Sequence, residues 1–541
     1  MYLNDQLYVA HCDNGPLYIT GKMCNRHGLI AGATGTGKTV SLQVLAETFS
    51  QAGVPCFMAD MKGDLSGISQ VGKMTGFIEK RCAKFGIENP EFQACPVRFY
   101  DVFGEQGFPM RTTISAMGPQ LLSRLMDLNE TQTGVMNIVF KIADDKQLLL
   151  IDLKDLRLML DFVAKNAAMF TTTYGNVSAA SIGAIQRSIL AIESEGGDKF
   201  FGEPAFDVND LMDTEGGKGV MSVLAADKLM LNPKLYSTYL LWLMTELYET
   251  LPEVGDLELP KLIFYFDEAH MLFEGTSKAL VDKLEQVIRL IRSKGVGIYF
   301  ITQSPTDIPD QILAQLSNRV QHALRAFTPK DQKDVRAAAQ TFRANPSFST
   351  EEAIMTLETG EALVSFLDEK GAPGMVERAK MLFPLSQIGA ITDGQRLDIK
   401  NAAPARIRAY EDFFDRESAY EVLTAVNAEV EAAKEQERLA KEQAKAEKEA
   451  AKAQREAERE AARQEKEAKK SSGWKRTIFG TLAGAVITSV ARSLGSSVGK
   501  AITGGSSKSS SGKDIIGKAA KSATQTATKK VTEEVLKSIF K

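Results

Sequence analysis

The chain has 541 residues, a formal net charge of −4, and 44% hydrophobic and 25% charged residues. These values are ordinary for a globular protein. They exclude a chain that is disordered throughout, or one that binds nucleic acid through overall positive charge. The length allows about two to four domains.

The cysteines indicate the cellular compartment of the protein, and the apolar runs indicate whether it crosses a membrane. All five cysteines lie between positions 12 and 95, and no C-x-x-C pair occurs. We therefore expect reduced thiols in a cytoplasmic protein, with neither a disulfide framework nor a zinc site. The first residues lack a signal-peptide pattern and no run of about 18 apolar residues occurs, so we expect no transmembrane segment.

The first predicted elements surround a glycine-rich segment. Residues 1–26 are typical of a short β preamble, and residues 27–31 (HGLIA) of a buried strand. Residues 32–39 (GATGTGKT) fit the phosphate-binding pattern G-x-x-x-x-G-K-[ST], and residues 40–46 have the apolar spacing of a helix. Strand, loop and helix in this order are the context that the pattern requires.

This loop supplies the groups that bind a nucleoside triphosphate. Backbone N–H groups and the N-terminus of a helix attract phosphate oxygens. Lys38 is expected to reach the β- and γ-phosphates, and Thr39 to bind Mg²⁺. The predicted nucleotide-binding residues are Gly32, Ala33, Thr34, Gly35, Thr36, Gly37, Lys38 and Thr39.

The segments after the loop predict an α/β fold with a mainly parallel sheet. Residues 55–60 (PCFMAD) form a second apolar strand, and a strand–helix–strand order implies a right-handed crossover. Residues 71–215 are mostly helical by pattern, which indicates a helical insertion. Strands are predicted again at 261–268, 297–303 and 320–326, and a closing hairpin at 361–367 and 375–382.

These elements place the α/β core at 27–70 and 216–425. Beyond it the composition changes, because residues 429–470 consist almost entirely of Ala, Glu, Lys, Arg and Gln. Apolar a and d positions are missing, so the pattern favours a single helix with i,i+4 ion pairs over a coiled coil. Its lysines and arginines form one stripe, which fits a solvated spacer or a surface for a nucleic acid or a partner.

Residues 471–541 form a basic tail rich in Gly, Ser, Ala and Thr. Such a composition predicts a flexible segment. Attachment to DNA, to an anionic membrane surface or to a protein partner is the alternative for the tail.

Nucleotide hydrolysis needs an acidic metal ligand and a group that orients or deprotonates water. Two apolar segments end in an acid, residues 148–152 and residues 263–268. The second ends in two acids, so we predict Asp267 as the Mg²⁺ ligand and Glu268 as the catalytic base. Helix capping is the alternative role for such a pair.

A polar residue and several arginines complete the predicted site. Gln303 ends the next strand and is expected to sense the γ-phosphate, with a turn as its alternative role. An arginine from a neighbouring subunit can stabilise charge in the transition state. The candidates are Arg289, Arg292, Arg319 and Arg325.

Two other motif matches are less informative. Residues 267–270 spell DEAH, but nothing downstream resembles a second helicase domain with its arginine-rich motif. Residues 60–63 fit the GTPase pattern D-x-x-G, but no guanine-reading N-K-x-D motif occurs.

Four segments in order resemble the HerA/FtsK superfamily of RecA-like motor ATPases. They are GATGTGKT at 32–39, DMKGD at 60–64, FYFDEAH at 264–270 and RSKGVGIYFITQSP at 292–305. About 1–400 is similar to bacterial HerA-like proteins of the YjgR type. Three further stretches support this likeness: NRHG at 25–28, the segment 134–160, and FFGEP at 200–204.

The resemblance implies a RecA-like P-loop fold with ATP and Mg²⁺ as cofactors. It also implies a hexameric ring, ATP between subunits and DNA in the centre, with Arg292 as the arginine that acts in trans. The N-terminal β-barrel of members that act at DNA ends does not fit in the residues before the loop. The membrane spans and winged helix of FtsK-type translocases are not evident either.

Three functions are compatible with these observations. The first is an ATP-driven motor that acts on DNA as a translocase or helicase. The second is an ATPase that moves or remodels protein in a secretion or coupling role. The third is a nucleotide-dependent scaffold that recruits a protein or an anionic surface through residues 429–541.

Overall fold

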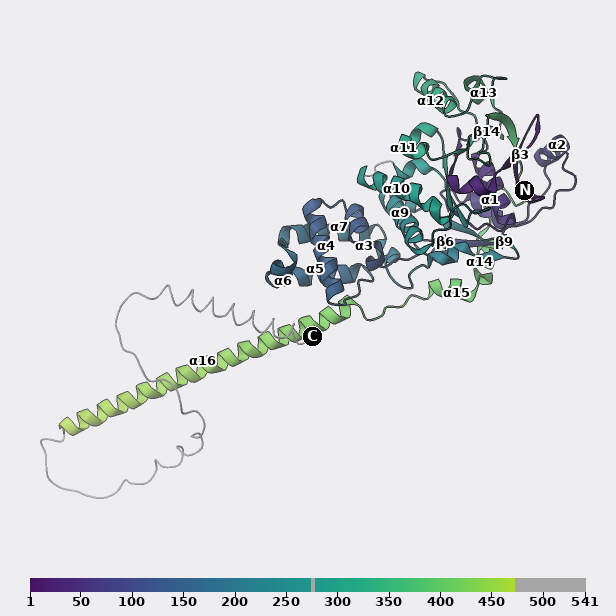
Figure 1. Ribbon diagram of the computed structural model, residues 1–541. Helices are drawn as coiled ribbons and strands as arrows, with labels where there is room; N and C mark the ends of the chain where they lie inside the picture. The colour runs from purple at the N-terminus through teal and green to yellow at the C-terminus, as the bar shows by residue number, and fades with distance from the viewer. Residues whose placement is uncertain (274–277, 472–541) are drawn as a thin grey trace. The chain divides into compact units, whose positions relative to one another are not determined.

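The computed structural model describes residues 1–273 and 278–471, with side chains up to residue 467 (Figure 1). It divides into two compact units, residues 1–420 and residues 421–541. The first unit contains a large mixed sheet with its helices. The described part of the second unit is helical. The tail predicted at 471–541 lies almost wholly outside the described residues.

The centre of the first unit is a parallel sheet in the order β13-β4-β12-β11-β5-β10-β6. When only β4, β5, β11, β12 and β13 are numbered in chain order, these five strands lie side by side in the order 5-1-4-3-2. This arrangement confirms the predicted α/β fold with a RecA-like P-loop core. The strands are β4 (Gly28–Ala31), β5 (Cys56–Asp60), β6 (Val97–Asp101), β10 (Met221–Ala225), β11 (Leu262–Phe266), β12 (Val296–Thr302) and β13 (Asn318–Gln321).

Antiparallel strands extend one edge of this sheet. β13 pairs with β14, β14 with β15, and β15 with β2, so the N-terminal residues join the edge formed by the closing hairpin. The bounds are β1 (Tyr2–Leu3), β2 (Gln6–Cys12), β3 (Gly15–Ile19), β14 (Glu361–Ser365) and β15 (Glu377–Met381). At the other edge β7 (Phe108–Pro109) pairs with β6, and β8 (Thr214–Glu215) and β9 (Lys218–Gly219) form a small separate pair.

Both faces of the central strands are buried, which explains why these strands are continuously apolar. On one face, Leu45 and Phe49 of α1 (Lys38–Gln51) belong to the same buried cluster as Tyr265 and Ile301. On the other face the rings of Phe57, Phe264, Phe266 and Phe300 follow one another across three strands. The remaining core helices are α2 (Gly76–Phe85), α9 (Pro233–Thr250), α10 (Lys278–Ile291), α11 (Asp310–Leu313), α12 (Pro329–Gln340) and α13 (Thr350–Thr356).

Six helices between β7 and β8 form a cluster of their own (Figure 1). They lie within the insertion predicted at 71–215, but that range also contains β6, a strand of the main sheet. Asp152, the alternative acidic site, does not end a strand; it caps α5 through the N–H groups of Lys154 and Asp155. The helices are α3 (Ile114–Leu125), α4 (Glu130–Asp145), α5 (Leu153–Lys165), α6 (Ala167–Tyr174), α7 (Ala179–Ser194) and α8 (Gly197–Phe200).

The described residues of the second unit belong to one helix, α16 (Ala419–Ser471). Ion pairs three or four residues apart run along it, including Glu431–Lys434, Glu435–Arg438 and Glu437–Lys441. Such pairs stabilise an isolated helix by about 0.2–0.5 kcal/mol each. Among the described residues, no helix is long and apolar enough to cross a membrane.

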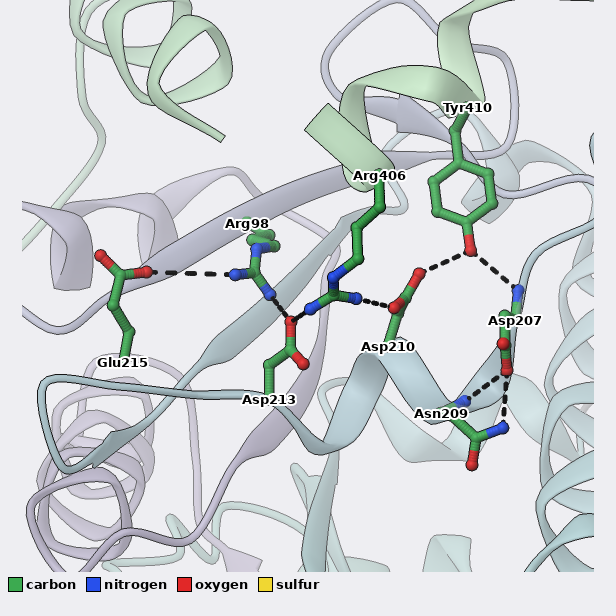
Figure 2. A network of polar contacts seen from close by, with 8 residues as sticks. All are labelled: Arg98, Asp207, Asn209, Asp210, Asp213, Glu215, Arg406 and Tyr410. Atoms are coloured by element: carbon green, nitrogen blue, oxygen red, sulfur yellow. Dashed lines mark hydrogen bonds and ion pairs between the residues drawn. The ribbon is translucent and has the colours of Figure 1, made fainter. Parts of the chain in front are cut away.

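A polar network fastens the last segment of the first unit to the loop before β8 (Figure 2). Arg406 pairs with Asp210 and Asp213, and Arg98 of β6 also pairs with Asp213. The Tyr410 hydroxyl donates to Asp210 at 2.6 Å and accepts the Asp207 N–H at 3.0 Å. The segment contains α14 (Asp393–Ala402) and α15 (Ala405–Arg408), so the network holds these helices against the core.

The Tyr410→Phe substitution tests this attachment. It leaves the Asp207 N–H without a partner and removes one hydrogen bond from the Asp210 carboxylate, which keeps its ion pair with Arg406. We therefore expect the free energy of unfolding to fall by about 1–3 kcal/mol. Urea unfolding measures the change. Tyr18→Phe is the control, because the Tyr18 side chain is exposed and its hydroxyl has no hydrogen bond within the described residues. Equal stability of the two variants would show that the hydrogen bonds of the Tyr410 hydroxyl contribute nothing.

Candidate nucleotide-binding site

The phosphate loop connects the buried strand β4 to α1. Gly35 and Gly37 have φ angles of +77° and +110°, which side chains rarely adopt. A Cβ atom on Gly32 would lie 2.5 Å from the Cβ atom of His322, so this position is also restricted to glycine. The backbone of the loop is therefore held in a shape that the glycines of the motif make possible.

Lys38 lies at the first turn of α1 and folds back over the loop. Its Nζ atom donates to the carbonyl oxygens of Gly32 at 2.6 Å and Ala33 at 3.2 Å. Burial lowers the pKa of Lys38, and the charges of Glu268 and Asp267 oppose that effect. An ammonium group held by neutral carbonyl groups can exchange them for phosphate oxygens, which bind a cation more strongly.

Asp267 follows β11 at the carboxyl end of the sheet and is 5% exposed. Its Oδ1 atom accepts the N–H of Glu268 at 3.0 Å. Burial, and then the neighbouring charge of Glu268, raises the pKa of Asp267 to about 6, while Lys62 opposes the shift. Within the described residues no cation pairs directly with this carboxylate, so the site fits a divalent ion that would stabilise its charged form.

Glu268 has contacts that differ from those of a capping residue. It occupies the N-cap position of the 3₁₀ helix Ala269–Leu272, but its side chain makes no capping hydrogen bond. Its φ of +46° is uncommon for a residue with a side chain. Its Oε1 atom accepts a hydrogen bond from Lys62 at 2.6 Å, and its Oε2 atom lies 3.5 Å from both Gln303 and His270. Burial tends to raise the pKa of Glu268, but Lys62 outweighs it and the net pKa is lowered.

Gln303 lies where the strand order predicts it. β12 is between β4 and β11, so the residue after β12 lies between the phosphate loop and Glu268. The following turn is capped by Ser304 with Asp307, so Gln303 is not its capping residue. The side chain of Gln303 is exposed and lines a cavity of about 480 Å³ with His270, Phe273 and Asp307.

Arg292 lies at the amino ends of the parallel strands, whereas the phosphate loop lies at their carboxyl ends. It precedes β12, whereas the phosphate loop follows the parallel neighbour β4. Seven residues of β12 at about 3.3 Å each place the amino and carboxyl ends of this strand about 23 Å apart. Arg292 lines a cavity of about 500 Å³ together with Arg26 and Arg289. It is therefore not part of the site of its own chain.

The other two arginine candidates have different surroundings. Arg319 donates to the carbonyl oxygens of Leu313 and Leu316, so it holds a turn before β13. Arg325 is exposed in the segment after β13.

Sequence reasoning did not identify Lys62 as a residue of the site. Asp60 ends β5 beside β11, and its carboxylate accepts the N–H groups of Lys62, Gly63 and Leu65. Burial, and then Asp64, raises the pKa of Asp60 to about 7. The segment 60–64 contains the GTPase pattern and is part of the family resemblance, but neither assigns a role to Lys62. Its contact with Glu268 depends on β5 and β11 being neighbours, which the motif does not show.

His322 was also missed. Its Nδ1–H donates to the Glu361 carbonyl at 2.8 Å, so its Nε2 atom accepts the Ser41 hydroxyl hydrogen bond at 2.9 Å. The His322 imidazole therefore links α1 to β14, next to Gly32 of the phosphate loop. Burial lowers the pKa of His322 to about 4. A single histidine after a strand gave no signal of this role.

The fold and the site define a P-loop NTPase core, and comparison of the sequence with known families gives a closer assignment. The family described as "Helicase HerA-like C-terminal" matches residues 5–510. The chain belongs to this family.

Two curated relatives match short stretches of the chain. The DNA double-strand break repair helicase HerA of Sulfurisphaera tokodaii is 31% identical over 109 residues, 20% of this chain and 21% of the relative. The protein of the same name from Sulfolobus acidocaldarius is 29% identical over 99 residues, 18% of this chain and 19% of the relative. The chain thus matches about a fifth of the length of these relatives.

Solved structures give distant matches. The bacterial conjugative coupling protein TrwB, in its unbound monoclinic form, is 14% identical with a TM-score of 0.46, covering 69% of this chain and 89% of TrwB. VirB4 of Thermoanaerobacter pseudethanolicus is 12% identical with a TM-score of 0.44, covering 71% of this chain and 96% of VirB4.

The His322→Asn substitution tests the role of the buried imidazole in stability. The folded protein keeps His322 neutral, with a pKa of about 4 against 6.5 for an unfolded chain. Its contribution to stability is therefore present above pH 6.5 and is lost as the pH falls through 4. The cost of the substitution should be largest at pH 8 and shrink toward pH 4 by at most about 3 kcal/mol. Urea unfolding at several pH values measures it, and a cost independent of pH would contradict the assignment.

Proposed function

We propose that this protein is an ATPase motor that works on DNA, as a translocase or helicase-like enzyme. The observation that carries the proposal is the convergence of Lys38, Asp267, Glu268 and Gln303 at the carboxyl ends of the parallel strands. These groups are a phosphate-binding ammonium, a buried acid, a second acid and an amide. Membership of the HerA-like family supports DNA as the partner.

Each residue of the site has a proposed role. The N–H groups of the phosphate loop and the Lys38 ammonium bind the phosphates of ATP. Thr39 and Asp267 hold Mg²⁺, and Glu268 accepts the proton of the attacking water. Gln303 orients the terminal phosphate or the water. When bound, Mg²⁺ neutralises charge that develops on the phosphate oxygens.

The position of Arg292 favours an assembly of several copies. The length of β12, about 23 Å, separates Arg292 from the phosphate-loop end of the strands, so it can serve hydrolysis only in another subunit. A head-to-tail ring places one surface of a subunit against a different surface of its neighbour. We propose such a ring, a hexamer as in the family resemblance, with Arg292 contacting the nucleotide of the adjacent subunit.

We also propose that the protein works in the cytoplasm and contacts a partner through residues 429–541. The five cysteines are free and buried, which supports a reducing environment such as the cytoplasm. The charged helix α16 and the segment after it are proposed to contact a protein or an anionic surface. This contact is separate from hydrolysis, which depends on the first unit.

The test of the function is the rate of ATP hydrolysis with and without DNA. We expect DNA to stimulate the wild-type rate, and Glu268→Gln to lower it by about 10²–10⁴-fold while ATP binding is retained. Stimulation should weaken steeply with salt, because phosphate contacts release counterions. Hydrolysis that ignores DNA would contradict the DNA motor and favour a protein-remodelling ATPase or a scaffold.

A binding control accompanies this experiment. Lys38→Ala removes the ammonium at the phosphate loop, so its affinity for ATP should fall below detection in a fluorescent-nucleotide titration. Unchanged affinity would show that the nucleotide binds elsewhere.

Mixing two inactive variants tests the role of Arg292. Arg292→Ala should bind ATP but hydrolyse it at least about 10³-fold more slowly. Mixing it with Glu268→Gln should restore part of the activity, because some interfaces then combine an intact Glu268 with an intact Arg292. Arg289→Ala is the matched control from the same cavity and should remain active. A mixture as inactive as its components would contradict action in trans.

A further inference from the structure

The loop after β5 has a fixed shape that brings a lysine to the candidate catalytic base. The Asp60 carboxylate accepts three backbone N–H groups of this loop, and Gly63 has a φ of +76°. A left-handed residue at that position turns the chain back toward the sheet. Lys62 therefore projects from a loop held by hydrogen bonds, across the end of β11.

Lys62 and Glu268 form a close ion pair. The Lys62 Nζ atom lies 2.6 Å from Oε1 of Glu268, while Gln303 and His270 lie 3.5 Å from Oε2. Both carboxylate oxygens of Glu268 thus already have polar neighbours. A carboxylate oxygen bonded to an ammonium group is held in place and is not free to bind water.

The exposures of the two side chains decide how the pair can open. The Glu268 side chain is 9% exposed and the Lys62 side chain 52% exposed. The carboxylate is therefore confined, whereas the ammonium can be reached from solvent. A half-exposed ion pair is weak enough to be broken by a competing anion.

We propose that Lys62 is a positioning residue that restrains Glu268 until nucleic acid binds. The ion pair occupies Oε1 of Glu268 and keeps this oxygen from binding the attacking water. Phosphate groups of the bound nucleic acid compete for the Lys62 ammonium and release the carboxylate. This inference rests on the proposed function, because it assigns the step by which DNA stimulates hydrolysis.

A purely structural ion pair is the competing explanation. Removing Lys62 leaves the confined Glu268 carboxylate without its cation, which destabilises the fold. That explanation predicts a lower unfolding temperature and an unchanged ratio of stimulated to unstimulated rates. A role in binding ATP predicts instead weaker ATP affinity and a slower rate.

The test uses Lys62→Met, which keeps the length of the side chain and removes its charge. We expect the DNA-free rate of the full-length protein to rise several-fold, toward the DNA-stimulated rate of the wild type. The stimulation ratio should fall toward one, with ATP affinity and KM little changed. Lys62→Arg should restore most of the stimulation because it keeps the charge. Lys73→Met is the matched control, an exposed lysine on another loop, and should behave like the wild type.

Several results would overturn the inference. An unchanged or lower DNA-free rate in Lys62→Met, or a loss of ATP affinity, would show that Lys62 does not restrain Glu268. Activation that persists when Glu268→Gln is added would show that it acts through another group. In both cases the wild-type ATPase would still stand. A wild-type protein that binds but never hydrolyses ATP would overturn the proposed function, and this inference with it.

Discussion

The site depends on one constraint, the order of the parallel strands. The carboxyl ends of all parallel strands lie on the same side of the sheet, and β12 separates β4 from β11. The residues after β4, β12, β11 and β5 therefore form a row along that side. Residues far apart in the chain become neighbours: the phosphate loop, Gln303, Glu268 and Lys62. A change in strand order would leave every motif intact and separate the groups.

Buried acids at this side of the sheet carry an energetic cost. Asp60 and Asp267 are both buried, and burial raises the pKa of each toward neutrality. They are stabilised differently, because Asp60 accepts three N–H groups whereas Asp267 accepts one. Asp60 is thus satisfied by its own loop, and Asp267 retains capacity for a metal ion. This difference separates a structural acid from a candidate ligand, although both end buried strands.

Local patterns predicted the elements that are buried on both faces. β5, β11 and β12 were visible as apolar runs, and the phosphate loop as a motif between a strand and a helix. Patterns were less informative for residues that could belong either to the main sheet or to the helical insertion. Residues 97–101 were included in the helical insertion but form β6, because a short apolar run does not reveal its neighbours. Asp152 resembled the end of a strand and instead caps a helix.

The sequence by itself determined the chemistry that is available: the glycines, Lys38 and Thr39 of the loop, and the acid pair at 267–268. These follow from motifs whose spacing is fixed by local backbone geometry. Only the tertiary structure decided which groups meet. It placed Lys62 on Glu268, His322 next to the phosphate loop, and Arg292 at the amino ends of the parallel strands. The reason is physical, because such contacts depend on which strands become neighbours, and no local pattern of residues specifies that order.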